Sequence, residues 1–149
     1  MLDHVEEVLR PHLFDVAAEL LERANALSER LGSVSGQAEV RAQQSILFYA
    51  QNQEAQARAA LEQGLALAER AGRPRLQATL LRDLGDLQTA GRDLNRGFES
   101  CERSVSLLRP LPDAFGVAQG LACLGRVHEL RGERLTKRQD GHPRAASGH

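Results

Sequence analysis

The sequence predicts an all-α fold in which antiparallel helix pairs stack as a solenoid of about three and a half repeats. Three observations predict this class. The 149-residue chain is rich in alanine and leucine and contains four phenylalanines, one tyrosine and no tryptophan, a composition that favours helices over strands. Its apolar residues recur with helical spacing. The sequence also repeats every forty residues, which is typical of stacked helical hairpins.

The period is visible at several positions of the chain. A shift by forty residues aligns Leu20-Leu21-Glu22 with Ala60-Leu61-Glu62 and Ser100-Cys101-Glu102, Leu27 with Leu67 and Leu107, and Ala38 with Ala78 and Ala118. Each hairpin in such a stack buries its apolar side only against its neighbours. The architecture therefore favours an extended binding groove over a catalytic pocket.

Two helices are predicted in the first part of the chain. Residues 2–10 form a short helix that we expect to end at Pro11, because proline removes a backbone donor. Residues 13–31 form a longer helix that ends at Gly32. Their apolar stripes are Leu2, Val5 and Leu9 in the first helix, and Ala17, Leu20, Leu21, Ala24 and Leu27 in the second.

The middle of the chain follows the same plan. Helices are predicted at 37–51, 54–71 and 75–90, separated by turns at Asn52-Gln53 and Gly72. The clearest amphipathic stripe belongs to the second of these helices and consists of Ala57, Ala60, Leu61, Gly64, Leu65 and Ala68. In the third helix Leu80, Leu84 and Leu87 face inward.

After a turn at Gly91-Arg92, two more helices are predicted at 94–109 and 114–131. Asp93 and Asp113 are suitable N-caps. The inner side of the last helix carries Ala118, Leu121, Leu124 and Val127. The pattern ends after Gly132, so we expect a repeat domain over 1–134 and a disordered tail over 135–149.

Small residues recur at matching positions of the repeat. The dipeptide Leu-Gly recurs forty residues apart as Leu84-Gly85 and Leu124-Gly125, with Gln44-Ser45 as a weaker copy. A small, a large and a small residue recur as Ala17, Leu21 and Ala24, as Ala57, Leu61 and Gly64, and as Gly97, Cys101 and Ser104. Over about residues 1–134 this pattern resembles the tetratricopeptide repeat, which implies a right-handed superhelix. Small residues there let two helix axes approach closely, and a bulky one would overpack the contact.

Two features depart from that family. The forty-residue period exceeds the usual length of about thirty-four residues and is similar to the variant in sensor arms of large bacterial signalling ATPases and in kinesin light chains. The segment 124–133 also begins a hairpin whose second helix does not follow. We therefore expect an uncovered, adhesive last helix; its apolar residues are Leu121, Leu124, Val127 and Leu130. A second copy or another protein would cover it, or the chain is a piece of a longer regulator.

The resemblance also implies where a ligand lies, because the first helix of each pair lines the concave side in this family. The matching positions are Glu39, Ala42, Ile46 and Tyr49, then Thr79, Arg82, Asp86 and Thr89, then Gln119, Ala122, Arg126 and Glu129. Tyr49 and Arg82 are the expected main contacts, since aromatic residues and arginine are frequent hot spots; alternatively, Tyr49 packs at a helix end. The Lys and Asn that hold chaperone C-terminal carboxylates in this family are not supplied by Ala42, Ile46, Asp86 and Ala122.

Charge and hydropathy restrict the other classes of function. The net charge is −1; residues 133–149 carry four basic and two acidic residues, which leaves −3 on the rest. Such a body is a poor match to a phosphate backbone, so no nucleic-acid partner is expected. The first ten residues are acidic and contain no signal-peptide core, and no apolar run is long enough to span a membrane. We therefore predict a cytoplasmic protein without a membrane partner.

No catalytic or metal-binding motif supports an enzyme. Phosphate-binding glycine loops, GxSxG and HExxH are missing. Cys101 and Cys123 lack CxxC spacing and are interpreted as small core residues. Asp83 and Asp86, three residues apart, are interpreted as solvated charges, and His128 has no second His or Cys at ligand spacing on its helix. No cofactor, metal site or catalytic residue is predicted.

The sequence thus predicts a protein-interaction module that binds a peptide or a partner helix along its groove, in a regulatory or scaffolding role. Two alternatives stay open. One is a self-associating structural module that uses the uncovered last helix. The other is a fragment of a larger signalling or transcriptional regulator.

Overall fold

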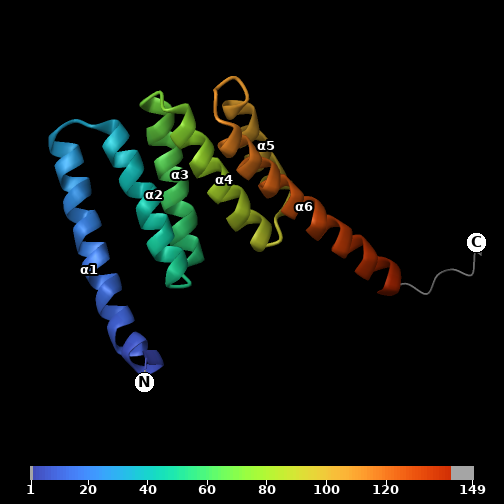
Figure 1. Ribbon diagram of the computed structural model, residues 1–149, viewed down its shortest axis with the longest axis horizontal. Helices are drawn as coiled ribbons and strands as arrows, with labels where there is room; N and C mark the ends of the chain where they lie inside the picture. The colour runs from blue at the N-terminus through green and yellow to red at the C-terminus, as the bar shows by residue number, and fades with distance from the viewer. Residues whose placement is uncertain (1, 142–149) are drawn as a thin grey trace, which may run out of the picture. The chain divides into compact units, whose positions relative to one another are not determined.

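The computed structural model describes the backbone of residues 2–141 and the side chains of residue 7 and residues 9–133. Within this part of the chain the regular structure consists of six α-helices, without strands (Figure 1). They are α1 (Leu2–Arg30), α2 (Val34–Ala50), α3 (Glu54–Arg70), α4 (Pro74–Ala90), α5 (Leu94–Leu108) and α6 (Ala114–Gly141). The predicted all-α class is confirmed.

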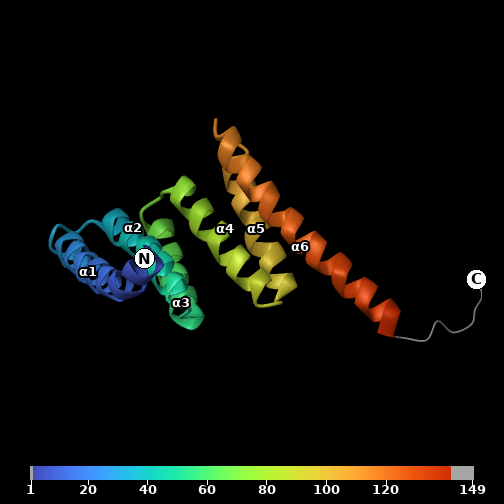
Figure 2. The same ribbon diagram turned by 60° about the horizontal axis from the view of Figure 1, so that its bottom comes forward.

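The chain divides into two compact units, residues 1–80 and 81–149, and the boundary lies inside α4. The first unit contains α1, α2, α3 and the first part of α4; the second contains the rest of α4, α5 and α6. Within each unit, helices that follow one another in the sequence run antiparallel, as Figures 1 and 2 show. Each unit is therefore built from helical hairpins.

One turn geometry recurs every twenty residues. Residues at positions 32, 52, 72 and 92 all have positive φ, between 60° and 68°. In each turn the next backbone N–H reaches back to a carbonyl five residues earlier, the pattern of a Schellman cap. These bonds join Ser33 to Ser28, Gln53 to Phe48, Arg73 to Ala68 and Asp93 to Gln88. The same short connection thus links α1 through α5, which confirms the predicted turns.

The connection between α5 and α6 differs from the other four. Position 112, where the next positive φ would fall, is occupied by Pro112, whose ring holds φ near −65°. The turn is instead closed by bonds from Leu111 N–H to Leu108 and from Asp113 N–H to Leu111. Asp113 then caps α6 by accepting from the Gly116 N–H at 2.8 Å, and Asp93 caps α5 in the same way. Both predicted N-caps are confirmed.

The first unit packs on small side chains. In α3 the predicted stripe is buried at Ala57, Ala60, Leu61, Gly64 and Ala68, with Leu65 partly buried. A Cβ added to Gly64 would lie 3.0 Å from Cβ of Arg41 and 3.5 Å from the carbonyl oxygen of Ala38. A larger residue at this position would therefore separate α2 from α3.

The second unit has a core of larger side chains. Leu81, Leu84 and Leu87 of α4 are buried, as are Leu94, Cys101, Val105 and Leu108 of α5. From α6, Cys123 and Val127 join Leu94 and Cys101 in one cluster, against which Phe98, Leu124 and Leu130 pack. The inward orientation predicted for Leu84 and Leu87 is confirmed.

Three predictions about helix ends and faces are wrong. α1 continues through Pro11, because proline removes one hydrogen bond but a long helix can continue around it. α6 continues past Gly132 to Gly141, so the predicted disorder does not apply to 135–141; the rest of the predicted tail, 142–149, lies outside the described residues. In α1 the predicted stripe is only partly covered, since Leu20 and Leu27 are exposed.

Candidate functional site

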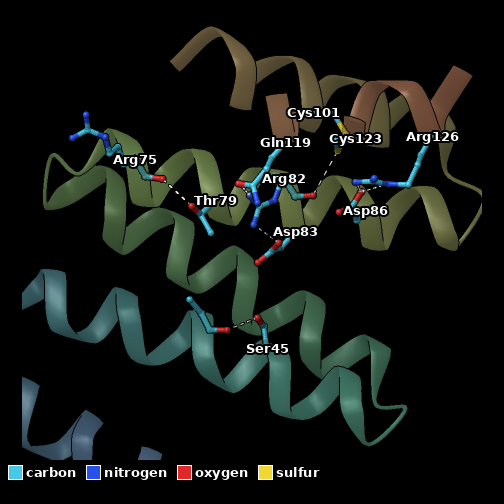
Figure 3. Close-up of polar contacts among 11 residues, drawn as sticks. Ser45, Arg75, Thr79, Arg82, Asp83, Asp86, Cys101, Gln119, Cys123 and Arg126 are labelled. Atoms are coloured by element: carbon cyan, nitrogen blue, oxygen red, sulfur yellow. Dashed lines mark hydrogen bonds and ion pairs between the residues drawn. A yellow bond between two sulfur atoms is a disulfide. The ribbon is translucent and has the colours of Figure 1, made fainter. Parts of the chain in front are cut away.

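Hydrogen bonds between polar side chains connect α4 with α6 in the second unit (Figure 3). Arg126 donates two hydrogen bonds to Oδ1 of Asp86, from Nη2 at 2.6 Å and from Nε at 3.0 Å. Nearer the start of both helices, Arg82 donates to Oε1 of Gln119. We call these four residues the polar row. All four were predicted to line a binding face, and the structure brings them together.

The polar row differs in accessibility from one end to the other. The side chains of Arg126 and Asp86 are 48% and 38% exposed, so their ion pair stabilises the fold by at most about 1 kcal/mol. Arg82 is more enclosed, and its guanidinium also reaches Oδ1 of Asp83 at 3.4 Å. The exposed pair can therefore exchange its partners with a ligand, whereas the Arg82 guanidinium is already engaged.

Asp83 lies beside the polar row and has a perturbed pKa. Burial of the carboxyl group raises its pKa above the ordinary value of 3.8, and the positive charge and hydrogen bond of Arg82 only partly offset that effect. The negative charge of Asp86 raises the pKa further. Asp83 is thus not the freely solvated charge that the sequence predicted.

A disulfide joins α5 to α6 close to the polar row. Cys101 of α5 and Cys123 of α6 are bonded, with Cα atoms 5.7 Å apart, and both are fully buried. Sγ of Cys123 lies 3.7 Å from the carbonyl oxygen of Arg82, as Figure 3 shows. The prediction that both cysteines are small core residues is confirmed for their burial, and the bond between them was missed.

The sequence contained only a partial signal for this disulfide. The two residues are 22 positions apart, and antiparallel neighbouring helices were predicted to contact each other along this stretch. Which residues face each other depends on the length and geometry of the turn between them. That turn is the irregular one at Pro112, so helix periodicity alone could not pair the cysteines.

In the first unit, two large apolar side chains are exposed on α2. Ile46 and Tyr49 are 57% and 56% exposed. Three residues apart on a helix, they share one face. We call them the apolar pair. Both were predicted to line the binding face, and their exposure is consistent with that role.

Two other predicted residues of the first unit take part in local contacts. Oε1 of Glu39 lies 3.1 Å from Nη1 of Arg73, which also donates to Ser35. Thr79 is exposed and donates a hydrogen bond to the carbonyl oxygen of Arg75 at 3.1 Å. Each predicted side chain is accessible but already has an intramolecular partner.

Other positions of the predicted groove vary in exposure. Ala42 is buried, and so is Thr89, whose hydroxyl donates to the carbonyl oxygen of Gly85 at 2.7 Å. Neither can contact a ligand in this structure, which corrects their placement on the concave surface. Ala122 and Glu129 of α6 are exposed.

The four residues expected to form an uncovered face on α6 do not form one. Val127 is fully buried, and Leu124 and Leu130 pack against the same cluster with α5. Only Leu121 is exposed, by 48%. The predicted inner side of α6 is correct at Val127 but wrong at Ala118 and Leu121, which are exposed. Gly120 and Cys123 are buried instead, and their small side chains are weak signals of burial.

Among the residues that the structure describes, no three or more His, Cys, Asp or Glu side chains gather where a metal ion could bind. No helix in the same part of the chain has the length and apolar character needed to cross a bilayer.

Comparison with known proteins gives a structural likeness only. No model of a protein family matches the sequence, and no curated protein does. A solved structure described as BtubC (BKLC) from P. vanneervenii is similar, with a TM-score of 0.70 and 20% sequence identity. The likeness covers 95% of this chain and 63% of the BtubC chain. At this identity it shows the fold alone, an all-α arrangement with the character of a helical repeat.

Proposed function

We propose that this protein is a tetratricopeptide-like solenoid that binds a peptide or a single helix of a partner protein, in a regulatory or scaffolding role. The apolar pair on α2 is the proposed anchor, with the exposed end of the polar row as a second contact for charged side chains. The match of small residues to the tetratricopeptide pattern and the likeness to a helical structure support this proposal. The partner segment that fits the apolar pair carries one or two apolar side chains on one face.

The apolar pair is the main support for the proposal, because the equivalent helices form without apolar residues at these two positions. At the positions of Ile46 and Tyr49, the next repeat has Asp86 and Thr89, and the last has Arg126 and Glu129. α4 and α6 therefore form with polar residues at both positions. Single exposed apolar residues are ordinary, but two on one face, where the repeat otherwise uses polar residues, indicate a surface kept for contact.

The exposed end of the polar row adds charge of both signs. Arg126 and Asp86 neutralise each other, and each retains a large exposed fraction. A ligand carboxylate could replace Asp86 on the Arg126 guanidinium, because arginine binds carboxylates through paired N–H groups. The two contacts lie in different units of the chain, so we treat each as a separate contribution to affinity.

A selection experiment tests the proposed anchor. The wild-type protein would be screened against a phage-displayed peptide library, and the dissociation constants of the enriched peptides measured by calorimetry. Replacing both Ile46 and Tyr49 with serine should weaken binding by about 30-fold or more, since an anchor residue contributes roughly 2 kcal/mol. The matched control replaces Leu13 and Val16, which are also three residues apart and exposed, and should leave affinity unchanged.

Two outcomes would contradict the proposal. One is that selection on this protein enriches no peptide beyond those that an unrelated helical protein enriches. The other is that enriched peptides bind the Ile46→Ser, Tyr49→Ser variant as tightly as the wild type. Loss of binding in Arg126→Gln alone, with the apolar-pair variant unaffected, would instead place the anchor in the polar row.

A further inference from the structure

The forty-residue period assigns each described helix to one of two types. α2, α4 and α6 begin at residues 34, 74 and 114 and align as first helices of a pair. α3 and α5 begin at residues 54 and 94 and align as second helices. α1 ends at Arg30, forty residues before α3 ends at Arg70, so it is also a second helix. The part of the chain that the structure describes therefore contains two complete pairs, α2–α3 and α4–α5.

Close contacts inside the two pairs show which positions of a first helix meet its second helix. In α2–α3, the space for a Cβ on Gly64 is limited by Arg41 and Ala38, with the nearest atom at 3.0 Å. In α4–α5, a Cβ on Gly85 would lie 2.7 Å from Sγ of Cys101. The positions of a first helix that meet its second helix are thus 38 and 41 in α2, which meet Gly64, and 85 in α4, which meets Cys101.

α6 leaves these positions exposed. Its equivalents of Ala38, Arg41 and Ser45 are Ala118, Leu121 and Gly125. Leu121 is 48% exposed, whereas Leu81, forty residues earlier, is 1% exposed. A Cβ added to Gly125 would meet no atom within 4 Å, whereas Gly85 at the same repeat position is closely surrounded. This face of α6 is therefore a first-helix contact surface without a second helix on it.

α1 has the complementary uncovered surface. Its residues Ala17, Leu21 and Ala24 are only partly buried, while their counterparts in α3 and α5 are buried. Leu20 is 57% exposed, but Ala60 and Ser100 at the same repeat position are 4% and 8% exposed. This face of α1 is a second-helix contact surface without a first helix on it.

We propose that α6 of one copy packs against α1 of a second copy and so joins the chains head to tail. The contact follows the geometry of the pairs already present in the chain: Ala118 and Leu121 lie against Ala24, and Gly125 accepts Leu21. Leu20 becomes buried at the same time. The occupant is a second copy because the surface left open on α6 is the type that α1 of this same chain fits.

The two surfaces differ, so the interface is heterologous. Such contacts do not close at a dimer; they continue until a ring forms or extend as an open chain. The proposal is independent of ligand binding by the apolar pair, because Ile46 and Tyr49 belong to neither surface. It also differs from pairing of two α6 helices, in which identical surfaces would meet and assembly would stop at two copies.

Analytical ultracentrifugation of the full chain over a range of concentrations tests this mode. The wild-type protein should exceed the dimer mass as concentration rises. Leu121→Asp blocks the α6 surface and Leu20→Asp blocks the α1 surface, so each variant alone should stay monomeric. Their mixture should form a one-to-one dimer and nothing larger, because α6 of the Leu20→Asp protein and α1 of the Leu121→Asp protein are intact.

The controls separate assembly from folding and from ligand binding. Both replaced residues are about half exposed, so the helical circular dichroism of the variants should match that of the wild type. If either aspartate variant loses that signal, Ala118→Glu is used to block the α6 surface and Ala24→Glu to block the α1 surface. Ala59→Asp, at an exposed position of α3 outside both surfaces, should assemble like the wild type.

Three results would overturn the proposal. A wild-type protein that stays monomeric at all concentrations excludes it. A wild type that stops at a dimer, with only Leu121→Asp preventing the dimer, indicates pairing of two α6 helices instead. A mixture of the two folded single variants that remains monomeric shows that the two surfaces do not meet.

Discussion

Gly85 lies directly against Cys101: a Cβ placed on Gly85 would stand 2.7 Å from Sγ of Cys101 and 3.2 Å from Sγ of Cys123. Because both sulfurs are held in the disulfide, they cannot move aside as a flexible side chain would. Gly85→Ala should therefore lower the free energy of unfolding by about 1–3 kcal/mol, as expected for overpacking of a core. Chemical denaturation of the purified protein measures the change.

Gly125 provides the matched control for that substitution. It occupies the same repeat position forty residues later, and nothing lies within 4 Å of a Cβ built there. Alanine should stabilise this helix by about 0.5–1 kcal/mol, because glycine loses more backbone entropy than alanine. Equal effects of the two substitutions would show that the close packing around Gly85 is not as described.

The disulfide should stabilise the second unit strongly. Cys101 and Cys123 are 22 positions apart, and closing a loop of this size in the unfolded chain is worth about 3 kcal/mol in the chain-entropy model. Replacing both cysteines with alanine should therefore lower Tm by about 5–10 °C. Thermal unfolding followed by circular dichroism measures this shift.

Reductant provides the control for the disulfide prediction. It should lower the Tm of the wild-type protein towards that of the double alanine variant and leave the variant unchanged. The prediction fails if two thiols react with Ellman's reagent in denatured, unreduced protein. The predicted cytoplasmic location makes this measurement informative, since disulfides are rare in reducing compartments.

Asp83 should make stability depend on pH. Burial raises its pKa in the folded state, so the folded protein binds the proton more tightly than the unfolded chain. The contribution of this group to stability is therefore greatest below its ordinary pKa of 3.8 and falls as pH rises through the raised value. Asp83→Asn should raise Tm near pH 7, and the difference from the wild type should close as the solution is acidified.

Thermal unfolding at several pH values measures that difference. Asp15→Asn, at an exposed position on α1, controls for the loss of one negative charge. A Tm difference between Asp83→Asn and wild type that stays constant or widens towards acid pH would show that burial does not raise the pKa of Asp83.

Much of the fold could be predicted because it follows from local signals. Gly32, Gly72 and Asn52 predicted turns that the structure contains, and the alanine stripe of α3 predicted its buried face. The errors occurred where a local signal competes with a longer-range contact. Pro11 weakens α1 without ending it, and the inner face of α6 depends on small residues, whose burial hydropathy does not reveal.

The candidate site was predictable only in outline. Repeat position alone placed Asp86 and Arg126 on one surface, and the structure joins them. Repeat position could not show that the guanidinium of Arg82 is already engaged by Gln119 and Asp83, because side-chain pairing depends on the distance between α4 and α6. The same distance determines the disulfide, which periodicity could not reveal either.

Among the four repeated turns, the one at Arg92 has a residue with a long side chain at the left-handed backbone position. Its φ is 68°. The equivalent turns have glycine at 32 and 72 and asparagine at 52, residues that tolerate this region. A left-handed conformation costs other residues about 1–2 kcal/mol. Arg92→Gly should therefore stabilise the protein by about 1 kcal/mol, after allowance for the greater entropy of glycine in the unfolded chain.

Gly72→Ala provides the opposite substitution in an equivalent turn. Its φ is 64°, and no neighbouring atom lies within 4 Å of a Cβ built there, so backbone strain alone should destabilise the variant, by about 1 kcal/mol. Urea denaturation of both variants should give changes of opposite sign. A destabilised Arg92→Gly would mean that the arginine side chain contributes more at this turn than its backbone strain costs.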